Sequence, residues 1–268
     1  MFMPVGDEVP IKIVPIVNLI LIATCAIVFF YQLSLLPGEA EALLRGYGMT
    51  PGVLLEGRSL PPGIETIDPL LTVVTSMFLH GGLEHIIGNM LFLWIFGNNI
   101  EEAMGHVRFA MFYVICGIVA ALVQGFVLTS SMVPMIGASG AISGVLGAYI
   151  VLHPTANIRT FIWAGFYYRT VHVPAYLYLG GWILFQVIFG LADDPEQGGV
   201  AWFAHIGGFM AGLVLVPFFR LPGVPMWGDP PQRRPWDDEP PTGGAGGPGP
   251  GASDQTGPIE RGRRGPWG

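Results

Sequence analysis

The feature that most constrains this chain is a series of apolar stretches, each close to the length that a helix needs to cross a bilayer. A transmembrane helix needs about 20 apolar residues, and such stretches lie at residues 14–36, 86–105, 107–129, 173–192 and 200–219. Only 12% of the residues are charged and the mean hydropathy is +0.56, whereas an ordinary soluble domain is about one-quarter charged. The sequence therefore predicts an all-α membrane protein with several spans.

A sixth apolar stretch, residues 139–152, is shorter than the others and is bounded by Pro134 and Pro154. Its length alone fits either a re-entrant segment or a short span. Its small residues would let it sit inside a bundle, where neighbouring helices shield it from lipid. We therefore predict six transmembrane helices within a domain at residues 14–220, with a long outer loop at about 37–79.

The positions of arginine and lysine predict the orientation, because cytoplasmic loops next to spans are enriched in these residues. Five basic residues fall on one side of the proposed bundle: Lys12, Arg108, Arg159, Arg169 and Arg220. Arg45 and Arg58 are exceptions in the long loop, where the rule is weak. Both termini are therefore expected in the cytoplasm. The short N-terminal segment, residues 1–13, lacks the features of a transit peptide and favours a bacterial plasma membrane.

Composition also sets expectations outside the spans. The C-terminal segment 221–268 is rich in proline, glycine and charged residues, a mixture that cannot bury a core, and we expect it to be disordered. The net charge is -7 and no basic stripe is present, which excludes nucleic acid as a partner. Cys25 and Cys116 lie in apolar stretches without a CxxC motif, so they are expected to be packing residues.

Polar side chains inside membrane spans are costly, which makes them candidates for function. In the proposed topology the second, fourth and sixth spans run in the same direction. Each has polar residues near its first turns: His85 and Asn89, Ser139, and His205. A single serine in a membrane helix commonly bonds only a backbone carbonyl, so the inference depends on all four lying at a similar depth.

These residues supply the parts of a hydrolytic site. Ser139 provides a hydroxyl nucleophile, and His205 provides an imidazole that can act as general base and then as general acid. His85 and Asn89, four residues apart, share a helical face. Together with the backbone N–H groups of Ser139 and Gly140 at a helix start, they could bind a tetrahedral oxyanion. No carboxylate is placed to orient His205, so the sequence predicts a Ser-His dyad.

The spacing of glycines predicts how the fourth and sixth spans meet. Gly140 and Gly144 form a GxxxG motif, as do Gly208 and Gly212. Such motifs permit two helix backbones to approach closely. Packing of this kind would bring His205 to Ser139.

Other chemistry has less support. His80, Glu84 and His85 form H-x-x-x-E-H, one residue longer than the inverted zinc motif, and we predict neither a metal nor another cofactor. The sequence GASGA around Ser139 also lacks the second glycine of the G-x-S-x-G elbow. Glu101, at the inner end of the second span, is expected to bond the end of a neighbouring helix.

Three segments resemble the signature segments of a known family: HGGLEHIIGNMLFLWIFGNNIEEAMG from His80, GASGAISGVLGAY around Ser139, and AHIGGFMAGL around His205. Together they are similar to the rhomboid intramembrane serine proteases, over about residues 70–219. The resemblance implies a six-helix core with a water-filled cavity, in which Ser139 is the nucleophile and His205 the base. It implies that His85 and Asn89 complete the oxyanion site. It also implies substrates that are single-pass membrane proteins, cleaved in or near their membrane segments.

Two positions depart from the family pattern. A Trp-Arg pair in the first loop is replaced by Leu71 and Thr72, and an aromatic one turn after the nucleophile is replaced by Ser143. How the His205 ring is held is therefore left open. A catalytically silent binder of membrane clients is the main alternative function, and retention of Ser139 and His205 argues against it. A transporter would be expected to contain an internal repeat, and the two halves show none.

Overall fold

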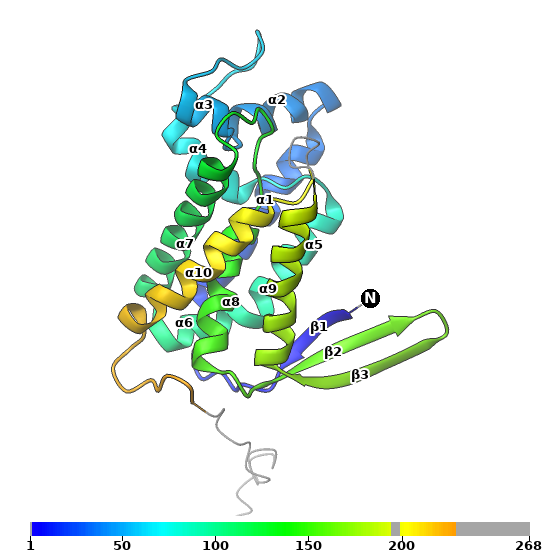
Figure 1. Cartoon of the computed structure of the whole chain (residues 1–268), viewed down its shortest axis with the longest axis vertical. Helices are drawn as coiled ribbons and strands as arrows, with labels where there is room; N and C mark the ends of the chain where they lie inside the picture. The colour runs from blue at the N-terminus through cyan, green and yellow to red at the C-terminus, as the bar shows by residue number, and fades with distance from the viewer. Residues whose placement is uncertain (1, 194–198, 229–268) are drawn as a thin grey trace, which may run out of the picture. The chain divides into compact units, whose positions relative to one another are not determined.

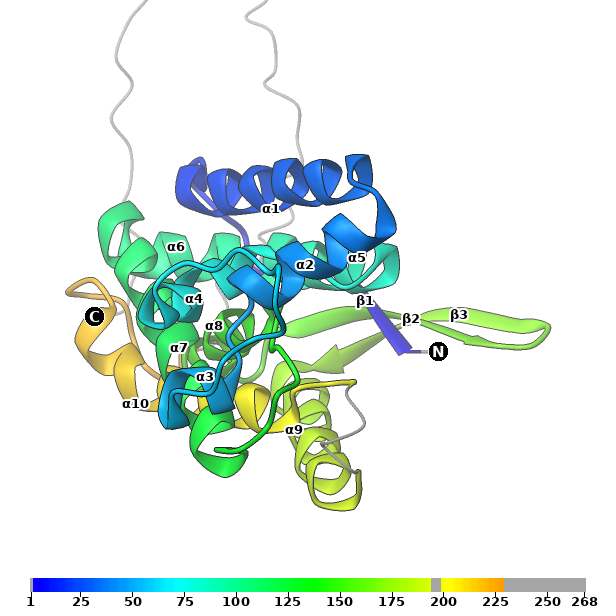
Figure 2. The same cartoon turned by 90° about the horizontal axis from the view of Figure 1, so that it is seen from above.

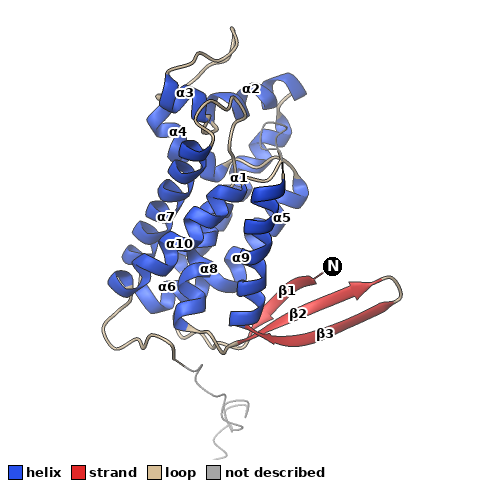
Figure 3. Ribbon diagram, viewed as in Figure 1, coloured by secondary structure: helices blue, strands red, loops and turns tan. Residues whose placement is uncertain are grey.

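The computed structural model describes residues 2–193 and 199–228 and is mostly helical (Figure 3). The apolar stretches form these helices: α1 (Ile16–Ser34), α5 (Leu83–Phe92), the π-helical segment η2 (Leu93–Gly97), α6 (Asn98–Met104), α7 (His106–Val127), α8 (Ser139–Leu152), α9 (Ala175–Ala192) and α10 (Trp202–Phe219). Segments α5, η2 and α6 follow one another without a break. Each of the six predicted stretches is thus helical, with ends within three residues of the predicted ones.

Not every apolar helix is long enough to cross a bilayer by itself. Among the described residues, α1, α7, α9 and α10 are long and apolar enough to cross a bilayer, and a pair bent by 82°, Pro69–Phe78 with Leu83–Met104, would make a fifth span. Helix α8 has 14 residues, which gives a length of about 21 Å, less than a hydrocarbon core of about 30 Å. The structure therefore supports four to five spans plus a short apolar helix, and the prediction of six is not confirmed.

The predicted outer loop contains short helices. These are α2 (Pro37–Tyr47), α3 (Pro51–Glu56), α4 (Pro69–Thr75) and the 3₁₀ turn η1 (Ser76–Phe78). A proline opens each of the first three, because its fixed φ suits the first turn and its missing N–H costs no helical hydrogen bond there. Helices α2, α3 and α4 lie over the end of the bundle where α8 begins (Figure 1). We call this the serine end.

The expectation of an all-α protein is wrong in one respect, because a three-stranded antiparallel sheet lies at the opposite end of the bundle (Figure 1). Its order is β1 (Phe2–Asp7), β2 (Asn157–Ala164), β3 (Tyr167–Pro174). Strands β2 and β3 are rich in β-branched and aromatic residues, which favour strands, and Gly165 turns between them at φ +63°. Part of the predicted N-terminal segment 1–13 is therefore a strand. We call this end of the bundle the sheet end.

Helix α8 is the centre of the core. Nearly all of its residues are buried, and it packs against α7 and α10 (Figures 1 and 2). Because its neighbours cover it, a short helix can satisfy every backbone hydrogen bond away from lipid. The remaining described helices surround this packed unit.

Glu101 has the structural role that its position predicts. Its carboxylate accepts hydrogen bonds from the backbone N–H groups of Val17 (2.9 Å) and Asn18 (2.7 Å), and it contacts the ring of His106 at 2.5 Å. The unpaired N–H groups at the start of α1 therefore receive a negatively charged acceptor, which suits both hydrogen bonding and the helix dipole. Most of the predicted disordered segment 221–268 lies outside the described residues.

Candidate active site

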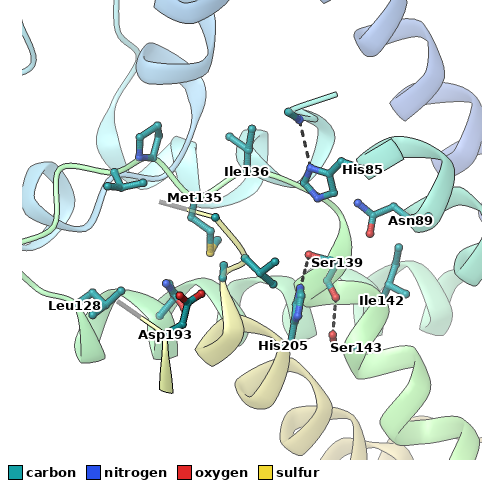
Figure 4. A pocket seen from close by; sticks show the side chains of 18 of the residues that line it. His85, Asn89, Leu128, Met135, Ile136, Ser139, Ile142, Ser143, Asp193 and His205 are labelled. Atoms are coloured by element: carbon teal, nitrogen blue, oxygen red, sulfur yellow. Dashed lines mark hydrogen bonds between the residues drawn. The ribbon is translucent and has the colours of Figure 1, made fainter. Parts of the chain in front are cut away.

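Ser139 and His205 meet across the two most closely packed helices. Ser139 is the first residue of α8, and His205 lies in the first turn of α10. The Oγ atom of Ser139 lies 2.8 Å from Nε2 of His205 (Figure 4). Two residues that are 66 positions apart in the chain thus form the hydrogen bond that a nucleophile and its base require.

The predicted glycine contacts between α8 and α10 bring Ser139 and His205 together. A Cβ atom added to Gly208 would lie 2.0 Å from the carbonyl oxygen of Gly140, and one added to Gly212 would lie 2.0 Å from that of Gly144. Backbone therefore lies directly against backbone along the α8–α10 crossing. Only glycine fits at Gly208 and Gly212, and the close approach sets Ser139 beside the first turn of α10.

Helix α9 holds the His205 ring. The Nδ1 atom of His205 lies 2.7 Å from Oε1 of Gln186, and the ring of Trp182 lies 5.8 Å from the imidazole, centroid to centroid. The amide nitrogen of Gln186 donates to the carbonyl oxygen of Trp182 at 3.4 Å, which leaves the amide oxygen facing the imidazole. Nδ1 is therefore the protonated nitrogen in neutral His205, and Nε2 is free to accept the Ser139 hydroxyl proton.

His85 and Asn89 lie on α5 and point toward the same space as Ser139 (Figure 4). The backbone N–H of Gly81 donates to Nδ1 of His85 at 3.3 Å, so neutral His85 carries its proton on Nε2 and can donate it. The Asn89 side chain is 7% exposed, and its Nδ2 has no hydrogen-bond partner in the described structure. An unpaired buried donor is costly. The pair therefore offers two donors to a group that would enter the site.

The start of α8 adds backbone donors. The first helical bond runs from Ile142 N–H to the carbonyl of Ala138, so the N–H groups of Ser139 and Gly140 have no partner within the helix. Gly137, with φ +116°, turns the chain into the helix, and a Cβ there would lie 2.7 Å from Nε2 of His85. The absence of a side chain thus lets the His85 ring lie against Gly137, two residues before Ser139.

A cavity of about 690 Å³ connects these groups. Its lining includes the four predicted polar residues as well as apolar side chains such as Met135, Ile136 and Ile142 (Figure 4). Asp193 also lines the cavity, but its carboxylate accepts a hydrogen bond from Trp202 Nε1 at 2.9 Å. The space is therefore mainly apolar with a cluster of hydrogen-bonding groups at one place, the usual form of a small-molecule or peptide site.

Ser143, which replaces the expected aromatic, does not contact the His205 ring in any described hydrogen bond. Its hydroxyl instead donates to the carbonyl of Ser139 at 2.6 Å. The ring contact comes from another helix, through Trp182 and Gln186. Leu71 and Thr72, the replacements in the first loop, lie in α4, where the Thr72 hydroxyl donates to the carbonyl of Pro69 at 2.6 Å.

Sequence reasoning missed three buried glutamines that bond residues in or near the site. Besides Gln186, Gln124 of α7 accepts a hydrogen bond from Ala204 N–H at 3.1 Å. Gln32 of α1 donates to the His80 carbonyl at 2.9 Å and accepts from the His80 N–H at 3.1 Å. Each is a buried polar residue in an otherwise apolar helix, and that signal alone could have marked them as candidates.

Comparison with known proteins decides the family. A family model described as "Rhomboid domain" matches residues 68–221, more than half of the chain. The chain belongs to the rhomboid family. This agrees with the resemblance of the three signature segments, and it makes the chain a multi-pass membrane protein.

Several curated relatives share this rhomboid region. RHOMBOID-like protein 6, mitochondrial, of Arabidopsis thaliana is 27% identical over 65% of this chain and 55% of its own length. Rhomboid protease GluP of Bacillus subtilis is 31% identical over 58% of this chain and 27% of its own length. Inactive rhomboid protein 1 of Drosophila melanogaster is 24% identical over 71% of this chain and 12% of its own length. The chain thus spans at most about half the length of these relatives, of which one is named mitochondrial, one a protease and one inactive.

Proposed function

We propose that this rhomboid is an intramembrane serine endopeptidase that cleaves single-pass membrane proteins in or near their membrane segments. The observation that supports this most directly is the 2.8 Å contact between Ser139 Oγ and His205 Nε2 beside an apolar cavity. Family membership supports it further, because at least one relative is named a protease.

The first chemical step would be attack on the peptide carbonyl. His205 accepts the hydroxyl proton at Nε2 while Ser139 Oγ forms a bond to the carbonyl carbon. The carbonyl oxygen becomes an oxyanion within reach of the donors on α5 and at the start of α8. Stabilisation of such an oxyanion by preset donors is commonly the largest contribution to this type of catalysis.

The second step would release the amine product. Protonated His205 donates from Nε2 to the leaving nitrogen, the C–N bond breaks, and an ester on Ser139 remains. Water then attacks that ester while His205 again accepts a proton. The bond between the acyl carbon and Oγ breaks, His205 returns the proton to Oγ, and the carboxylic acid product leaves with Ser139 restored. The cavity lies against Ser139 and His205, so water and substrate would share one route to them.

Gln186 would act as a positioning residue in this sequence of steps. Its amide oxygen accepts the Nδ1–H of His205 and keeps the proton on the nitrogen that faces away from Ser139. A carboxylate would stabilise the imidazolium more strongly, whereas an amide fixes the ring and its tautomer without adding charge. The catalytic pair is thus a Ser-His dyad assisted by a neutral third residue.

The bilayer arrangement would follow the predicted topology. Helix α8 would count as a sixth span that is too short to reach both surfaces alone and is sheltered by α7 and α10. The serine end would face the outside and the sheet end the cytoplasm, in a bacterial plasma membrane. The orientation rests on the placement of basic residues near the sheet end.

Covalent labelling tests the proposed chemistry at the residue that performs it. A fluorophosphonate should react with the detergent-purified protein and give a single adduct at Ser139, identified by mass spectrometry of the digest. Ser139→Ala should give no adduct, and His205→Ala should slow the reaction by about two orders of magnitude or more, since a general base contributes roughly 10² to 10⁴. An unreactive folded wild type would favour the alternative, a catalytically silent binder of membrane clients; one relative is named inactive.

A further inference from the structure

The hairpin formed by β2 and β3 differs chemically from the other described connections. Its 18 residues, Asn157 to Pro174, contain five aromatic residues and two arginines but no aspartate or glutamate. Aromatic residues and arginine are the types that are enriched where proteins meet the headgroup region of a bilayer. The composition therefore suggests a lipid contact rather than a solvated loop.

Exposure increases from the base of the hairpin to its tip. At the base, Ile158 and Thr160 are buried against the bundle. Toward the tip, Trp163 is 53% exposed, Tyr168 is 73% exposed, and Phe166 in the turn is fully exposed. The tip extends sideways, clear of the helices (Figures 1 and 2), so more than half of the surface of each of these aromatic residues stays exposed.

The hairpin leaves the bundle at the end of a candidate membrane span. Strand β3 ends at Pro174 and α9 begins at Ala175, so the hairpin starts where a candidate span ends. Helix α9 is the least buried of the candidate spans, and its first turn exposes Tyr176 and Leu177. A lipid-facing surface on α9 therefore continues directly into the hairpin, and a strand pair that leaves the bundle sideways at this level runs along the bilayer surface.

The two faces of the hairpin differ in a way that suits such a surface. Trp163 and Tyr168 are opposite each other in the register, so their side chains share one face. The next pair, Ile162 and Arg169, points to the other face, and Arg169 is exposed. One face thus offers aromatic rings to the acyl boundary, while the other offers a guanidinium to phosphate groups.

We propose that the tip of the β2–β3 hairpin inserts into the headgroup region of the leaflet at the sheet end, where Arg169 binds anionic phospholipid. The occupant is the bilayer rather than a protein, because the aromatic surface continues the lipid-facing surface of α9 and because the segment carries only positive charge, which complements anionic lipid. The hairpin would then hold the sheet end at a fixed depth beside α9.

A fluorescent reporter at the turn tests this proposal without any need for proteolytic activity. The full-length Phe166→Cys protein is labelled with an environment-sensitive dye and placed in nanodiscs of phosphatidylcholine, alone or mixed with an equal part of phosphatidylglycerol. The unsubstituted protein, whose Cys25 and Cys116 are both fully buried, is treated in parallel as a blank for labelling. The dye at Glu65→Cys, exposed in the loop at the serine end, is the comparison site away from the hairpin.

A headgroup location predicts blue-shifted emission at position 166 and several-fold stronger quenching by a lipid with a nitroxide near its headgroup than by a water-soluble nitroxide. Adding phosphatidylglycerol should increase the lipid quenching, and Arg169→Gln should remove that increase. Water-like emission quenched only by the soluble nitroxide would overturn the proposal. Energy transfer between labelled copies that rises with the number of copies per disc would overturn it as well, in favour of contact between chains.

Discussion

At the scale of single residues, the orientation of His205 depends on an amide rather than a carboxylate. In Gln186→Leu the Nδ1–H of His205 loses its acceptor, and a buried unpaired donor costs about 1–3 kcal/mol. We expect kcat for a single-span substrate to fall roughly 10- to 100-fold, with little change in KM. Each 1.4 kcal/mol added to the activation free energy slows the reaction about tenfold.

Two further variants distinguish the role of Gln186 in positioning His205 from a role in the packing of α9. Gln186→Glu keeps an acceptor oxygen at the same reach and should retain much of the activity, with a changed pH profile of kcat. Leu184→Ala, at an exposed position on the same helix, should leave kcat unchanged. Equal kcat values in wild type and Gln186→Leu would show that the 2.7 Å contact has no part in catalysis.

Asn89 offers an unused donor to the site, and its removal should affect the transition state more than the bound substrate. We expect Asn89→Ala to reduce kcat by about 10² to 10³, the loss typical of one oxyanion donor, while KM stays near the wild-type value. Ile87→Ala lies between His85 and Asn89 but on an exposed part of α5 and serves as the matched control. Steady-state kinetics with one substrate distinguish the two, and a loss confined to KM would argue for substrate binding instead.

The four site residues predicted from the sequence lie together for two reasons. The four-residue spacing places two of them on one face of α5, and the glycine contacts set how α8 and α10 cross. His85 and Asn89 could be paired from a four-residue spacing, and Ser139 and His205 from their equal depth. Gln186 could not be placed in the same way. Helix α9 is apolar on all sides, so its sequence does not predict how the helix is rotated about its own axis. The direction of the Gln186 side chain therefore depends on packing that the sequence does not reveal.

At the scale of elements, the crossing of α8 and α10 is the contact on which the site depends most. In Gly212→Ala the new methyl group would meet the carbonyl oxygen of Gly144, which cannot move without the helix. We expect a loss of about 1–3 kcal/mol from overpacking, seen as a lower unfolding temperature in detergent. Fluorophosphonate labelling of Ser139 should slow in parallel.

The matched control is Gly181→Ala in α9, where an added Cβ meets nothing within 4 Å. Alanine has the higher helix propensity, so this variant should unfold at the wild-type temperature or slightly above it. Similar unfolding temperatures for Gly181→Ala and Gly212→Ala would mean that the two helices separate easily, contrary to the packing described.

The lengths of the apolar stretches predicted the ends of the long helices to within three residues. They could not predict the sheet. Strands β2 and β3 occupy a segment between two spans, where topology alone suggests a loop. Their partner β1 comes from the N-terminus, more than 150 residues away in the chain. Pairing over such a distance leaves no local pattern in the sequence, and β1 has only six residues.

At the scale of the whole molecule, Asp7 joins the sheet to α8, the helix that begins at Ser139, and to α6. It accepts hydrogen bonds from the Tyr149 hydroxyl of α8 and from the Asn99 amide of α6, each at 2.6 Å. Burial raises the pKa of Asp7 from 3.8 to about 6, although Tyr149, the nearby charge of Arg159 and Asn99 oppose the shift. The folded protein therefore binds this proton more tightly than the unfolded chain.

A dependence of stability on pH follows from that raised pKa. The stabilisation is fully present below about pH 4, the unfolded value, and is lost as pH rises through about 6. The unfolding temperature in detergent should thus fall across this window by more in wild type than in Asp7→Asn, which has no proton to lose there. Parallel curves for the two proteins would place the titrating group elsewhere.

The central claim is that Ser139 and His205 together hydrolyse a peptide bond within a bilayer. The most direct measurement is cleavage of a single-span model substrate by purified protein in liposomes, with Ser139→Ala and His205→Ala reconstituted at the same density. The account predicts products from wild type, with the new N-terminus in or near the substrate's membrane segment, and only background levels from both variants. Cleavage by Ser139→Ala at the wild-type rate would contradict it.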